Sequence, residues 1–410
     1  MRQTLRLRGL NQHVHLLSHK DIEEGSKSYG PGGFHPVYVG DIYNGQYEVL
    51  NKLGYGVYST VWLARNLKAT KGDGHEFVAL KILSAEAYGT SNDIYEREIL
   101  KHLRNGNKRL IGYAHVCHLL DDFEHRGPNG THVVLVFEPI GETLRSFGAW
   151  FPDSMIPNNL MRRFTIQLLL ALDFAHDQKV IHTDIQPSNI FVKMQDQTRI
   201  EIGYLSKPPP HQDRTKGEYT IIPSRPLRQY YFDKNNARDD QFNIVLGDWG
   251  VASWVDKHLT EVIQPVALRA PEVLIGAPWD ASADMWNLGA IVLEMFRAIR
   301  MFSGEVSRGQ YKLEEHLAEI VHLCGPFPKS LLERGDPELV GRIFDKDGTV
   351  KGIKFSPDRP TLSDEVLTPG LDKEVRDEFL AFMKLVMKIE PKERPTPEDV
   401  LRGPWLRALR

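Results

Sequence analysis

The residues best suited to chemistry lie in the stretch "HTDIQPSNIFV" at 182–192. Asp184 can accept the proton of a hydroxyl group, and the amide oxygen of Asn189, five residues later, can coordinate Mg²⁺. This spacing is common by itself. It gains weight here because a strand-like "KVI" and a long amphipathic segment precede it. In this context the spacing makes Asp184 a candidate catalytic base and Asn189 a candidate metal ligand.

A second metal ligand is suggested by Asp248, which follows the apolar stretch "FNIVLG" and precedes Trp249 and Gly250. A carboxylate at the end of a strand is well placed to bind a divalent cation. Ordinary turns contain the same arrangement. On these residues alone, both interpretations stay open.

A candidate phosphate-binding turn is "LGYGVYSTV", which begins at Leu53. Gly54 and Gly56 would let the backbone come close to phosphate groups, and Val61 could pack on a base. Ser59 stands where a third glycine would be usual. Taken alone, two glycines in such a turn indicate a simple hairpin more often than a nucleotide site.

A lysine inside an apolar strand provides a further candidate. Lys81 follows Ala79 in "VALKI", so its stem is expected to be buried, and a buried ammonium group needs a counter-charge. The next helix offers Glu96 and Glu98. The choice between them rests on a resemblance: when E-x-x-I-L is aligned with the corresponding helix of protein kinases, Glu96 is the partner of Lys81 and Glu98 is a solvated helix acid.

Three other charged residues are expected to support the structure. Glu272 in "APE" and Arg394 in "KERP" are predicted to form a buried ion pair. Asp284 in "SADMW" precedes an apolar helix and is expected to anchor the backbone of the 182–189 loop.

The elements that would hold these residues fall into two groups. Alternating apolar residues predict strands around 46–65, 76–83, 115–125 and 132–140, with one helix at 92–104 capped by Asn92 or Asp93. After Gly141, helical spacing predominates. We expect a leader at 1–45, a sheet-rich lobe at 46–141 and a helical lobe at 142–410. Within the helical lobe we expect a loop insertion at 196–243 and a further insert at 303–370.

Composition limits the class of protein. Net charge is −3 over 410 residues, which gives no indication of direct nucleic-acid binding. No apolar stretch is long enough for a membrane helix. Two cysteines fit a reducing compartment, so cytoplasm and nucleus are the expected locations. Four basic residues among the first 20 faintly suggest a presequence, but a flexible leader is the favoured interpretation.

The order of the motifs is more specific than any one of them. Glycine turn, V-A-x-K, helical glutamate, H-x-D-x-x-x-x-N, D-x-G, A-P-E and a late arginine follow one another as in protein kinases. From about Gly32 to Leu406 the chain resembles the SR-protein kinases, which phosphorylate Arg-Ser-rich splicing factors. The segments that carry this resemblance include "HPV", "HTDI", "ASWVDKHLTEVIQ" and "EEHLAEIVHLCGPFPKSLL". The tract 196–243 lies where this family has a longer spacer, so the chain looks like a short-spacer, fungal-type member.

The resemblance implies an α+β, bilobal kinase fold, with a small antiparallel sheet and one helix in the first lobe and a larger helical second lobe. It implies a Ser/Thr kinase that uses ATP and Mg²⁺. Lys81, held by Glu96, would contact the α- and β-phosphates, and Asp184 and Gln186 would serve catalysis. Mg²⁺ would be bound by Asn189 and Asp248. The implied ATP contacts are Leu53, Gly54, Gly56, Ser59, Val61, Ala79, Lys81, Phe137, Glu138, Ile140 and Phe191.

Regulation and substrate follow from the same resemblance. Thr183 replaces the arginine that would pair with a phosphorylated activation loop, which implies activity without that phosphate. Family members bind basic segments in an acidic groove, and a solvated helix face is the alternative interpretation of the acids here. The acids in the matching region are Glu314, Glu315, Glu319, Glu333, Asp336 and Glu338.

Departures from the family pattern leave a second function open. Gln186 replaces the catalytic-loop lysine, Ser188 replaces the usual residue before Asn189, and Pro265 begins a divergent segment. Loss of one electrostatic contact at a transferring phosphate costs about 10²–10³ in rate. An active, monomeric kinase for basic proteins is favoured. The alternative is a catalytically weak pseudokinase or scaffold that binds basic peptides.

Overall fold

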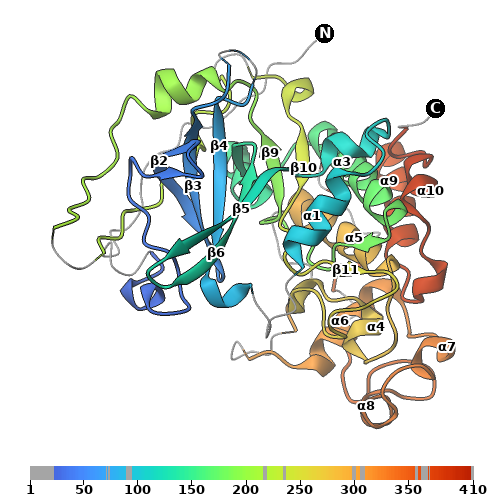
Figure 1. Ribbon diagram of the computed structural model, residues 1–410. Coiled ribbons are helices and arrows are strands. Elements are labelled where there is room, and N and C mark those ends of the chain that lie inside the picture. Colours follow the sequence, from blue (N-terminus) through green and yellow to red (C-terminus); the bar gives the residue numbers. More distant parts are fainter. Residues whose placement is uncertain are drawn as a thin grey trace. The chain divides into compact units, whose positions relative to one another are not determined.

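The computed structural model describes residues 23–407, apart from 71, 73, 89–94, 216–218, 234–236, 298–301, 305–309, 356–358, 362–367 and 369. The described chain forms two compact units (Figure 1). Unit 1 comprises residues up to Gly106, Cys117–Thr143 and Phe191–Asn243, and unit 2 comprises Asn107–Val116, Leu144–Ile190 and the chain from Ile244 onward. Each unit is described by itself.

Unit 1 is built on an antiparallel sheet with the strand order β1-β2-β3-β4-β6-β5. The central strands β4 and β6 are apolar and buried along most of their length, as expected for strands that are covered on both faces. The strands are β1 (Ile42–Tyr43), β2 (Tyr47–Tyr55), β3 (Ser59–Asn66), β4 (Phe77–Leu83), β5 (Leu119–Gly127) and β6 (Gly130–Phe137). Trp62, Leu80 and Val134 lie in the core on one face.

One helix, α1 (Glu96–Arg104), accompanies the sheet, and its buried side chains Ile99, Leu100 and Leu103 recur with helical spacing. The predicted caps Asn92 and Asp93 lie outside the described residues. Beyond β6, the short strand β7 (Ile140–Thr143) pairs with β9 (Ile190–Lys193).

The insertion at 196–243 differs from our expectation, because its described residues belong to unit 1 and not to the helical lobe. It contains a short π-helical turn, Ile200–Tyr204. Ile222 is buried in the core of the sheet with Trp62. Ile200, Tyr204 and Leu227 form a second cluster with Leu63 and Phe77. Because successive residues of a strand point to opposite faces, Trp62 and Leu63 show that the insertion reaches both faces of the sheet.

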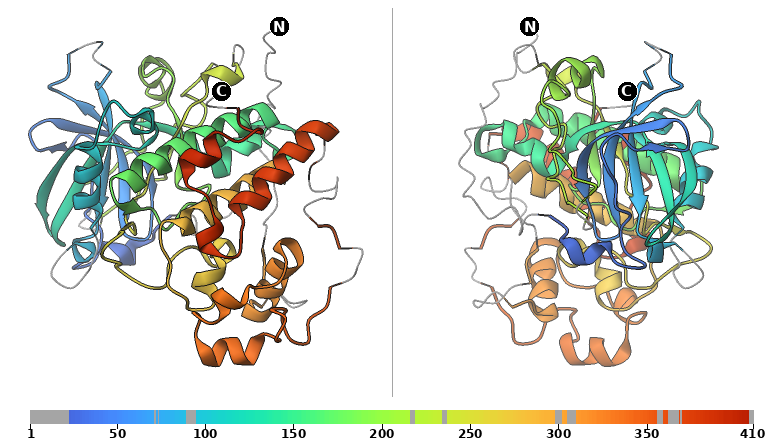
Figure 2. Two further views of the ribbon diagram at one scale, coloured as in Figure 1. Left: turned by 90° about the vertical axis from the view of Figure 1, so that its right-hand side faces the viewer. Right: turned by 60° about the vertical axis from the view of Figure 1, so that its left-hand side comes forward.

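Unit 2 is mainly helical. In both views of Figure 2, the green helix α3 and the red helices α9 and α10 pack in one bundle, and α3 contacts α5 and α10. The helices are α2 (Leu144–Phe147), α3 (Asn158–Asp177), α4 (Pro271–Leu274), α5 (Ser282–Arg297), α6 (Leu313–Cys324), α7 (Lys329–Leu332), α8 (Pro337–Ile343), α9 (Lys373–Val386) and α10 (Pro397–Leu401). Short strands are β8 (Val180–Ile181), β10 (Ile244–Leu246) and β11 (Ser253–Trp254). Within the described part of the chain, no helix has the length and apolar character to span a membrane.

The predicted ion pair of unit 2 is confirmed. Glu272 at the start of α4 and Arg394 are both inaccessible to solvent and joined by two hydrogen bonds of 2.6 and 2.7 Å. Arg394 also donates to the carbonyl groups of Lys388, Ile389 and Ser282. These contacts satisfy the guanidinium group, so the pair joins three segments that are far apart in the sequence.

Candidate functional site

Unit 1 holds the ion pair that the sequence predicted. Lys81 on β4 lies 2.6 Å from Glu96, the first residue of α1. The Glu96 side chain is 3% exposed and the Lys81 side chain 17% exposed. The helix therefore supplies the counter-charge of the strand lysine, while the lysine keeps some access to solvent. Glu98, expected to be solvated, accepts a hydrogen bond from the hydroxyl of Tyr88.

The register of strands β2, β3, β4 and β6 places several predicted nucleotide contacts opposite one another. Val61 lies opposite both Gly54 on β2 and Lys81 on β4. Ala79, two residues before Lys81 and hence on the same face, lies opposite Phe137 on β6. The remaining contacts follow closely: Leu53 and Ser59 flank the glycine turn, Glu138 and Ile140 follow β6, and Phe191 lies opposite Thr143 in the β7–β9 pair.

The glycine turn has room for a ligand. A Cβ atom added at Gly54 would meet no described atom within 4 Å, and one at Gly56 would meet only the Ser59 hydroxyl, at 3.8 Å. Neither glycine has a positive φ angle. Internal packing and backbone conformation therefore do not require these glycines, and a group approaching from outside would benefit from the missing side chains. This observation fits a bound nucleotide phosphate.

Unit 2 holds its own group of predicted site residues, around Asp184. The amide nitrogen of Gln186 lies 2.9 and 3.0 Å from the two carboxylate oxygens of Asp184. The amide nitrogen of Asn189 donates to the Asp184 carboxylate at 2.7 Å and to its main-chain carbonyl at 2.9 Å. Three residues of one loop thus form a single hydrogen-bonded cluster. Gln186, which the resemblance assigns to catalysis, thus orients the carboxylate of Asp184 in this structure.

The environment of Asp184 alters its acidity. Burial raises the pKa of the Asp184 carboxyl above its usual value, and the charge of Asp248 adds to this effect. The His182 ring and the hydrogen bonds from Gln186 and Asn189 act in the opposite direction without cancelling the rise. A raised pKa makes a carboxylate a better proton acceptor.

Asp284 anchors the loop backbone, as the sequence predicted. Its carboxylate accepts hydrogen bonds from the backbone N–H of His182 at 2.9 Å and of Thr183 at 3.0 Å, and its side chain is wholly buried. The imidazole of His176 on α3 lies 2.9 Å from the same carboxylate. Burial tends to raise the pKa of Asp284, but these hydrogen bonds and the histidine charges hold it below its usual value.

Thr183 joins the loop to the following segment without using a charge. It is 2% exposed and has the left-handed backbone angle φ 65°. Its hydroxyl donates to the carbonyl of Val251 at 2.8 Å, and the His182 ring contacts the carbonyl of Gly247 at 2.9 Å. A neutral threonine thus makes the connection between the two segments.

The predicted metal ligands provide suitable atoms for Mg²⁺. The N–H groups of Asn189 are directed at Asp184, and the amide oxygen is the atom that would coordinate a cation. Asp248 is exposed and, like Thr183, has a left-handed backbone, with φ 58°. Among the residues that the structure describes, no three His, Cys, Asp or Glu side chains form a metal-binding group.

A hydrogen-bond network that we did not predict lies in the segment before α4. Gln264 is buried, has φ 69° and accepts a hydrogen bond from the backbone of Ala270 at 2.8 Å. Its amide donates to the Ala283 carbonyl at 2.9 Å and to Asn287 at 3.0 Å. Arg269 donates to the carbonyl of Gln264 at 3.0 Å. The spacing of residues in "VIQPVALRAPEV" does not predict this network, because Ala283 and Asn287, the partners of the Gln264 amide, lie about twenty residues further along the chain.

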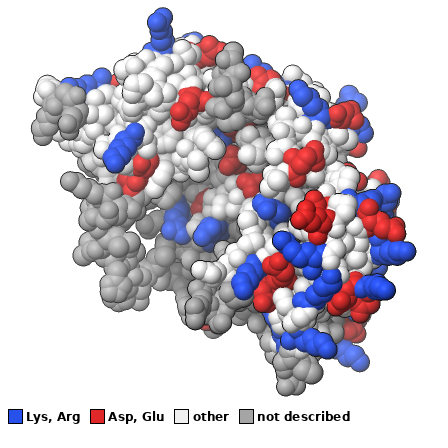
Figure 3. All heavy atoms as spheres, turned by 90° about the horizontal axis from the view of Figure 1, so that it is seen from below, with Lys and Arg blue, Asp and Glu red and all other residues white. Residues whose placement is uncertain are grey.

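The acids expected to line a docking groove differ in availability. Glu319 is 8% exposed and accepts hydrogen bonds from the backbone of Ser303 and Gly304 and from Arg359, so it is a structural acid. Asp336 caps helix α8 through the backbone N–H of Leu339. Figure 3 shows acidic and basic side chains interleaved over unit 2 on the face drawn.

The remaining predicted docking acids are only loosely paired. Glu314 lies 3.9 Å from Arg342, and Glu333 lies 3.5 Å from Lys329. Glu338 is exposed and Glu315 partly exposed. These four acids remain candidates for binding a basic segment.

Comparison with known proteins gives a consistent result. The model of the protein kinase domain family matches residues 47–203 and 233–406. A serine/threonine protein kinase of Aspergillus fumigatus is 32% identical over 94% of this chain and 90% of its own length. The serine/threonine-protein kinase SRPK of Physarum polycephalum is 31% identical over 94% of this chain and 91% of its own length.

Further matches agree. Protein kinase dsk1 of Schizosaccharomyces pombe is 28% identical over 95% of this chain and 86% of its own length. A crystal structure of a kinase domain matches with a TM-score of 0.62 over 91% of this chain and 98% of that one, at 20% identity, which speaks for the fold alone. The chain therefore belongs to the Ser/Thr protein kinases and, within them, to the SR-protein kinase family.

Proposed function

We propose that this protein transfers the γ-phosphate of ATP to serine residues of basic, Arg-Ser-rich proteins such as splicing factors. The observation that carries the proposal is the cluster around Asp184, whose carboxylate is oriented by Gln186 and Asn189 and has a raised pKa. The relatives whose names are SRPK and SRSF protein kinase support the substrate class.

Each half of the site has a role in this proposal. In unit 1, Lys81 would contact the α- and β-phosphates while Glu96 holds it, and the strand residues around Ala79 and Val61 would enclose the base. In unit 2, Asp184 would take the proton of the serine hydroxyl as its oxygen bonds to the γ-phosphorus and the bond to the β-phosphate oxygen breaks. Bound Mg²⁺ would neutralise phosphate charge, with Asn189 and Asp248 as its protein ligands.

Activity without phosphorylation of the activation segment is part of the proposal. Thr183 reaches the carbonyl of Val251 through a neutral hydrogen bond, and Gln264 holds the segment before α4 through uncharged contacts. A phosphate would find no arginine at position 183. We expect protein treated with a phosphatase to keep its full activity. A loss of most activity after this treatment would refute this part of the proposal.

A second function is favoured by one observation: the catalytic loop has Gln186 in place of a lysine, and its amide is directed at Asp184. Without that positive charge, developing charge on the phosphoryl group is less stabilised. The protein would then bind basic peptides and ATP while transferring phosphate slowly or not at all.

One assay separates the two functions. The full-length protein is incubated with Mg²⁺ and labelled ATP, with an Arg-Ser peptide and an unrelated basic protein as acceptors. Asp184→Ala serves as the inactive control. Label on serine above that control supports the kinase. Peptide binding with label no higher than the control would favour the scaffold.

We also propose that the protein acts as a monomer in the cytoplasm and nucleus, on proteins and not directly on nucleic acid. A net charge of −3 and the free thiols Cys117 and Cys324 support this. Light scattering checks the mass of 46.8 kDa expected for a monomer. Imaging of a tagged chain checks the location.

A further inference from the structure

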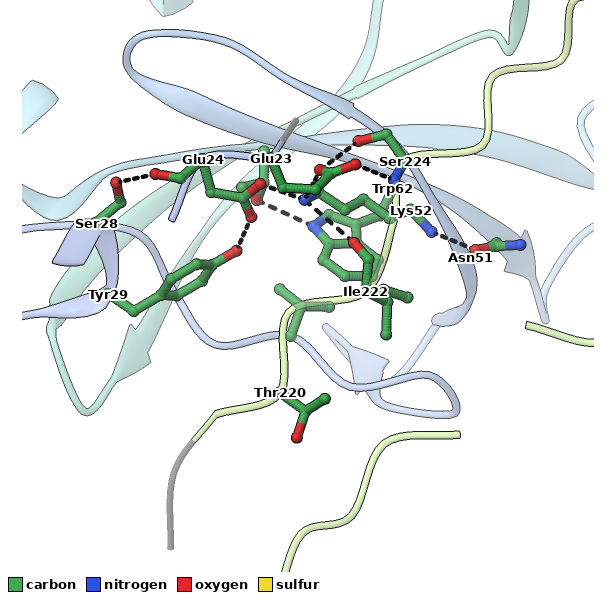
Figure 4. A network of polar contacts seen from close by, with 12 residues as sticks. Glu23, Glu24, Ser28, Tyr29, Asn51, Lys52, Trp62, Thr220, Ile222 and Ser224 are labelled. Atoms are coloured by element: carbon green, nitrogen blue, oxygen red, sulfur yellow. Dashed lines mark hydrogen bonds and ion pairs between the residues drawn. The ribbon is translucent and has the colours of Figure 1, made fainter. Parts of the chain in front are cut away.

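A lysine that plays no part in the proposed chemistry is completely buried at the base of the glycine turn. Lys52 on β2 has 0% of its side chain exposed, and its ammonium nitrogen lies 2.7 Å from Glu23 and 2.5 Å from Glu24. Figure 4 shows the two carboxylates converging on this nitrogen, which also reaches the carbonyl of Ile222 at 3.5 Å. We call Lys52, Glu23 and Glu24 the Lys52 cluster.

The cluster joins three segments that are distant in the sequence. Glu23 and Glu24 come from the leader, and Lys52 comes from the sheet. The insertion contributes Ser224, whose backbone N–H and hydroxyl donate to Glu23 at 2.6 and 2.9 Å. The next residue, Arg225, donates its backbone N–H to the carbonyl of Lys52 at 2.9 Å. Leader and insertion thus meet at one side chain of β2.

The charges make this junction sensitive to change. Two carboxylates face one ammonium group, so one negative charge has no cationic partner within the cluster. Neutral hydrogen-bond donors stabilise the carboxylates further: Ser224 donates to Glu23, and the hydroxyl of Tyr29 donates to Glu24. Burial alone would raise the pKa of Glu23, but the bonds from Lys52 and Ser224 hold it below its usual value. Removing the lysine would leave two buried acids without a counter-charge, which is strongly unfavourable.

The position of the cluster ties it to the nucleotide contacts. The pairing of β2 with β3 shifts register between Lys52 and Gly54, so a bulge lies where the strand leads into the glycine turn. A bulge re-aims the residues beside it, here Leu53 and Gly54. Leu53 also packs against the second cluster of the insertion, around Tyr204 and Leu227.

The insertion makes a further contact at β7, next to the predicted adenine contacts. The hydroxyl of Tyr231 donates to Glu142 at 2.8 Å, and Arg228 lies 3.5 Å from the same carboxylate. A Cβ atom at the neighbouring Gly141 would come within 2.4 Å of the Tyr231 ring. The insertion therefore contacts two strands, β2 at Lys52 and Leu53 and β7 at Gly141 and Glu142, and both strands carry predicted nucleotide contacts.

We propose that Lys52 is a positioning residue for nucleotide binding, through which the leader and the insertion set the shape of the glycine turn. This inference rests on the proposed kinase function, since it concerns the same nucleotide. It predicts that disrupting the cluster weakens ATP binding while the transfer step, which depends on unit 2, changes little.

The test compares full-length variants by direct titration with a fluorescent ATP analogue and by steady-state kinetics. For Lys52→Met we expect the nucleotide Kd and the KM for ATP to rise about tenfold, equivalent to about 1.4 kcal/mol, with kcat changed less than about twofold. Lys52→Arg keeps the charge and should restore most of the affinity. Lys388→Met removes a half-exposed lysine of unit 2 that is also paired, with Glu393, and serves as the matched control.

A milder variant protects the test against misfolding. Ser224→Ala removes one hydrogen bond to Glu23 and leaves all charges in place, and should raise the nucleotide Kd about threefold. Hydrogen exchange at the turn, where Gly56 donates to the carbonyl of Ser59 at 2.8 Å, should quicken in both variants.

The outcomes separate the two proposals. Nucleotide Kd values within twofold of wild type for both Lys52→Met and Ser224→Ala would overturn the inference, as would an equal rise for Lys388→Met. If the wild-type protein binds the analogue but phosphorylates no peptide, the proposed function fails while the effect of Lys52 on Kd still decides this inference. If the wild-type protein does not bind the analogue, both proposals are wrong.

Discussion

Two lysines of the unit 1 sheet, on strands β2 and β4 with β3 between them, are both paired with glutamate, but their surroundings differ. Lys81 lies 2.6 Å from Glu96 and is 17% exposed, whereas Lys52 contacts two glutamates and is inaccessible. A lysine that must contact an incoming anion keeps access to solvent. A lysine with surplus carboxylates around it and no access can only join protein segments. Exposure and local charge balance therefore distinguish the two roles better than residue type does.

The largest effect should come from the buried lysine. Lys52→Met leaves two buried carboxylates facing each other, and removing one partner of a buried pair costs about 3–5 kcal/mol. Unfolding of unit 1 by urea measures this, with hydrogen exchange on β2 as the local readout. A loss of stability below about 1 kcal/mol would mean that the cluster behaves like a surface ion pair. Lys52 and Lys81 would then not differ in the way proposed here.

Lys81→Met should show the opposite pattern. We expect kcat/KM to fall by about 10²–10³, as for loss of one electrostatic contact to a reacting group. The free energy of unfolding should change much less than in Lys52→Met, because Lys81 retains access to water in the folded protein. Parallel activity and urea measurements on the two variants check this. Equal losses of stability would contradict the assignment of different roles.

A third prediction concerns how stability depends on pH through His35, a leader residue that packs beside the same sheet. His35 is buried and packs edge-on against the ring of His125 and at a tilt against that of His132, and burial lowers its pKa to about 3. Its neutral form is thus favoured by folding, so its contribution is complete above the unfolded pKa of about 6.5 and is lost as the pH falls toward 3.

At pH 5 the wild-type protein should lose about 2 kcal/mol of stability from His35 alone. The lowered pKa values of His125 and His132 add to this loss. Urea unfolding at pH 7 and pH 5 measures it, and His35→Leu should reduce the difference between the two pH values. An unchanged pH dependence in that variant would show that His35 does not carry the effect.

The smallest expected effect concerns unit 2. Gln186→Lys keeps a donor for Asp184 and adds a positive charge at the catalytic loop, so we expect kcat to rise about tenfold, below the full value of one electrostatic contact. Gln186→Met, which lacks the donor, is the matched control and should lower kcat. An unchanged or lower kcat for the lysine variant would mean that the loop is adapted to glutamine.

Contacts between residues of the ordered motifs were predictable, even where the residues lie far apart in the sequence. Lys81–Glu96 and Asp284 under the 182–184 backbone follow from motif order, and Glu272–Arg394 follows from a shared pattern over a longer distance. The strands and the long helices follow from apolar periodicity, apart from shifts of a few residues at their ends.

The contacts of the insertion could not be predicted in the same way. Its buried residues, such as Ile222, Leu227 and Tyr231, are scattered among proline and charged residues and show no period of 2 or 3.6. The burial of Lys52 could not be predicted from the sequence for another reason. At the bulges of β2, Asn51 and Lys52 are both buried in succession, which a simple alternation would exclude.

We propose that Asp184, which Gln186 and Asn189 orient, makes this chain an active kinase. The most direct measurement is the transfer of labelled phosphate from Mg²⁺-bound ATP to serine of an Arg-Ser peptide, for wild type and Asp184→Ala side by side. We predict multiple turnovers by the wild type and a loss of at least about 10³-fold in the variant. Equal label in the two proteins, or none above background in the wild type, would contradict the claim.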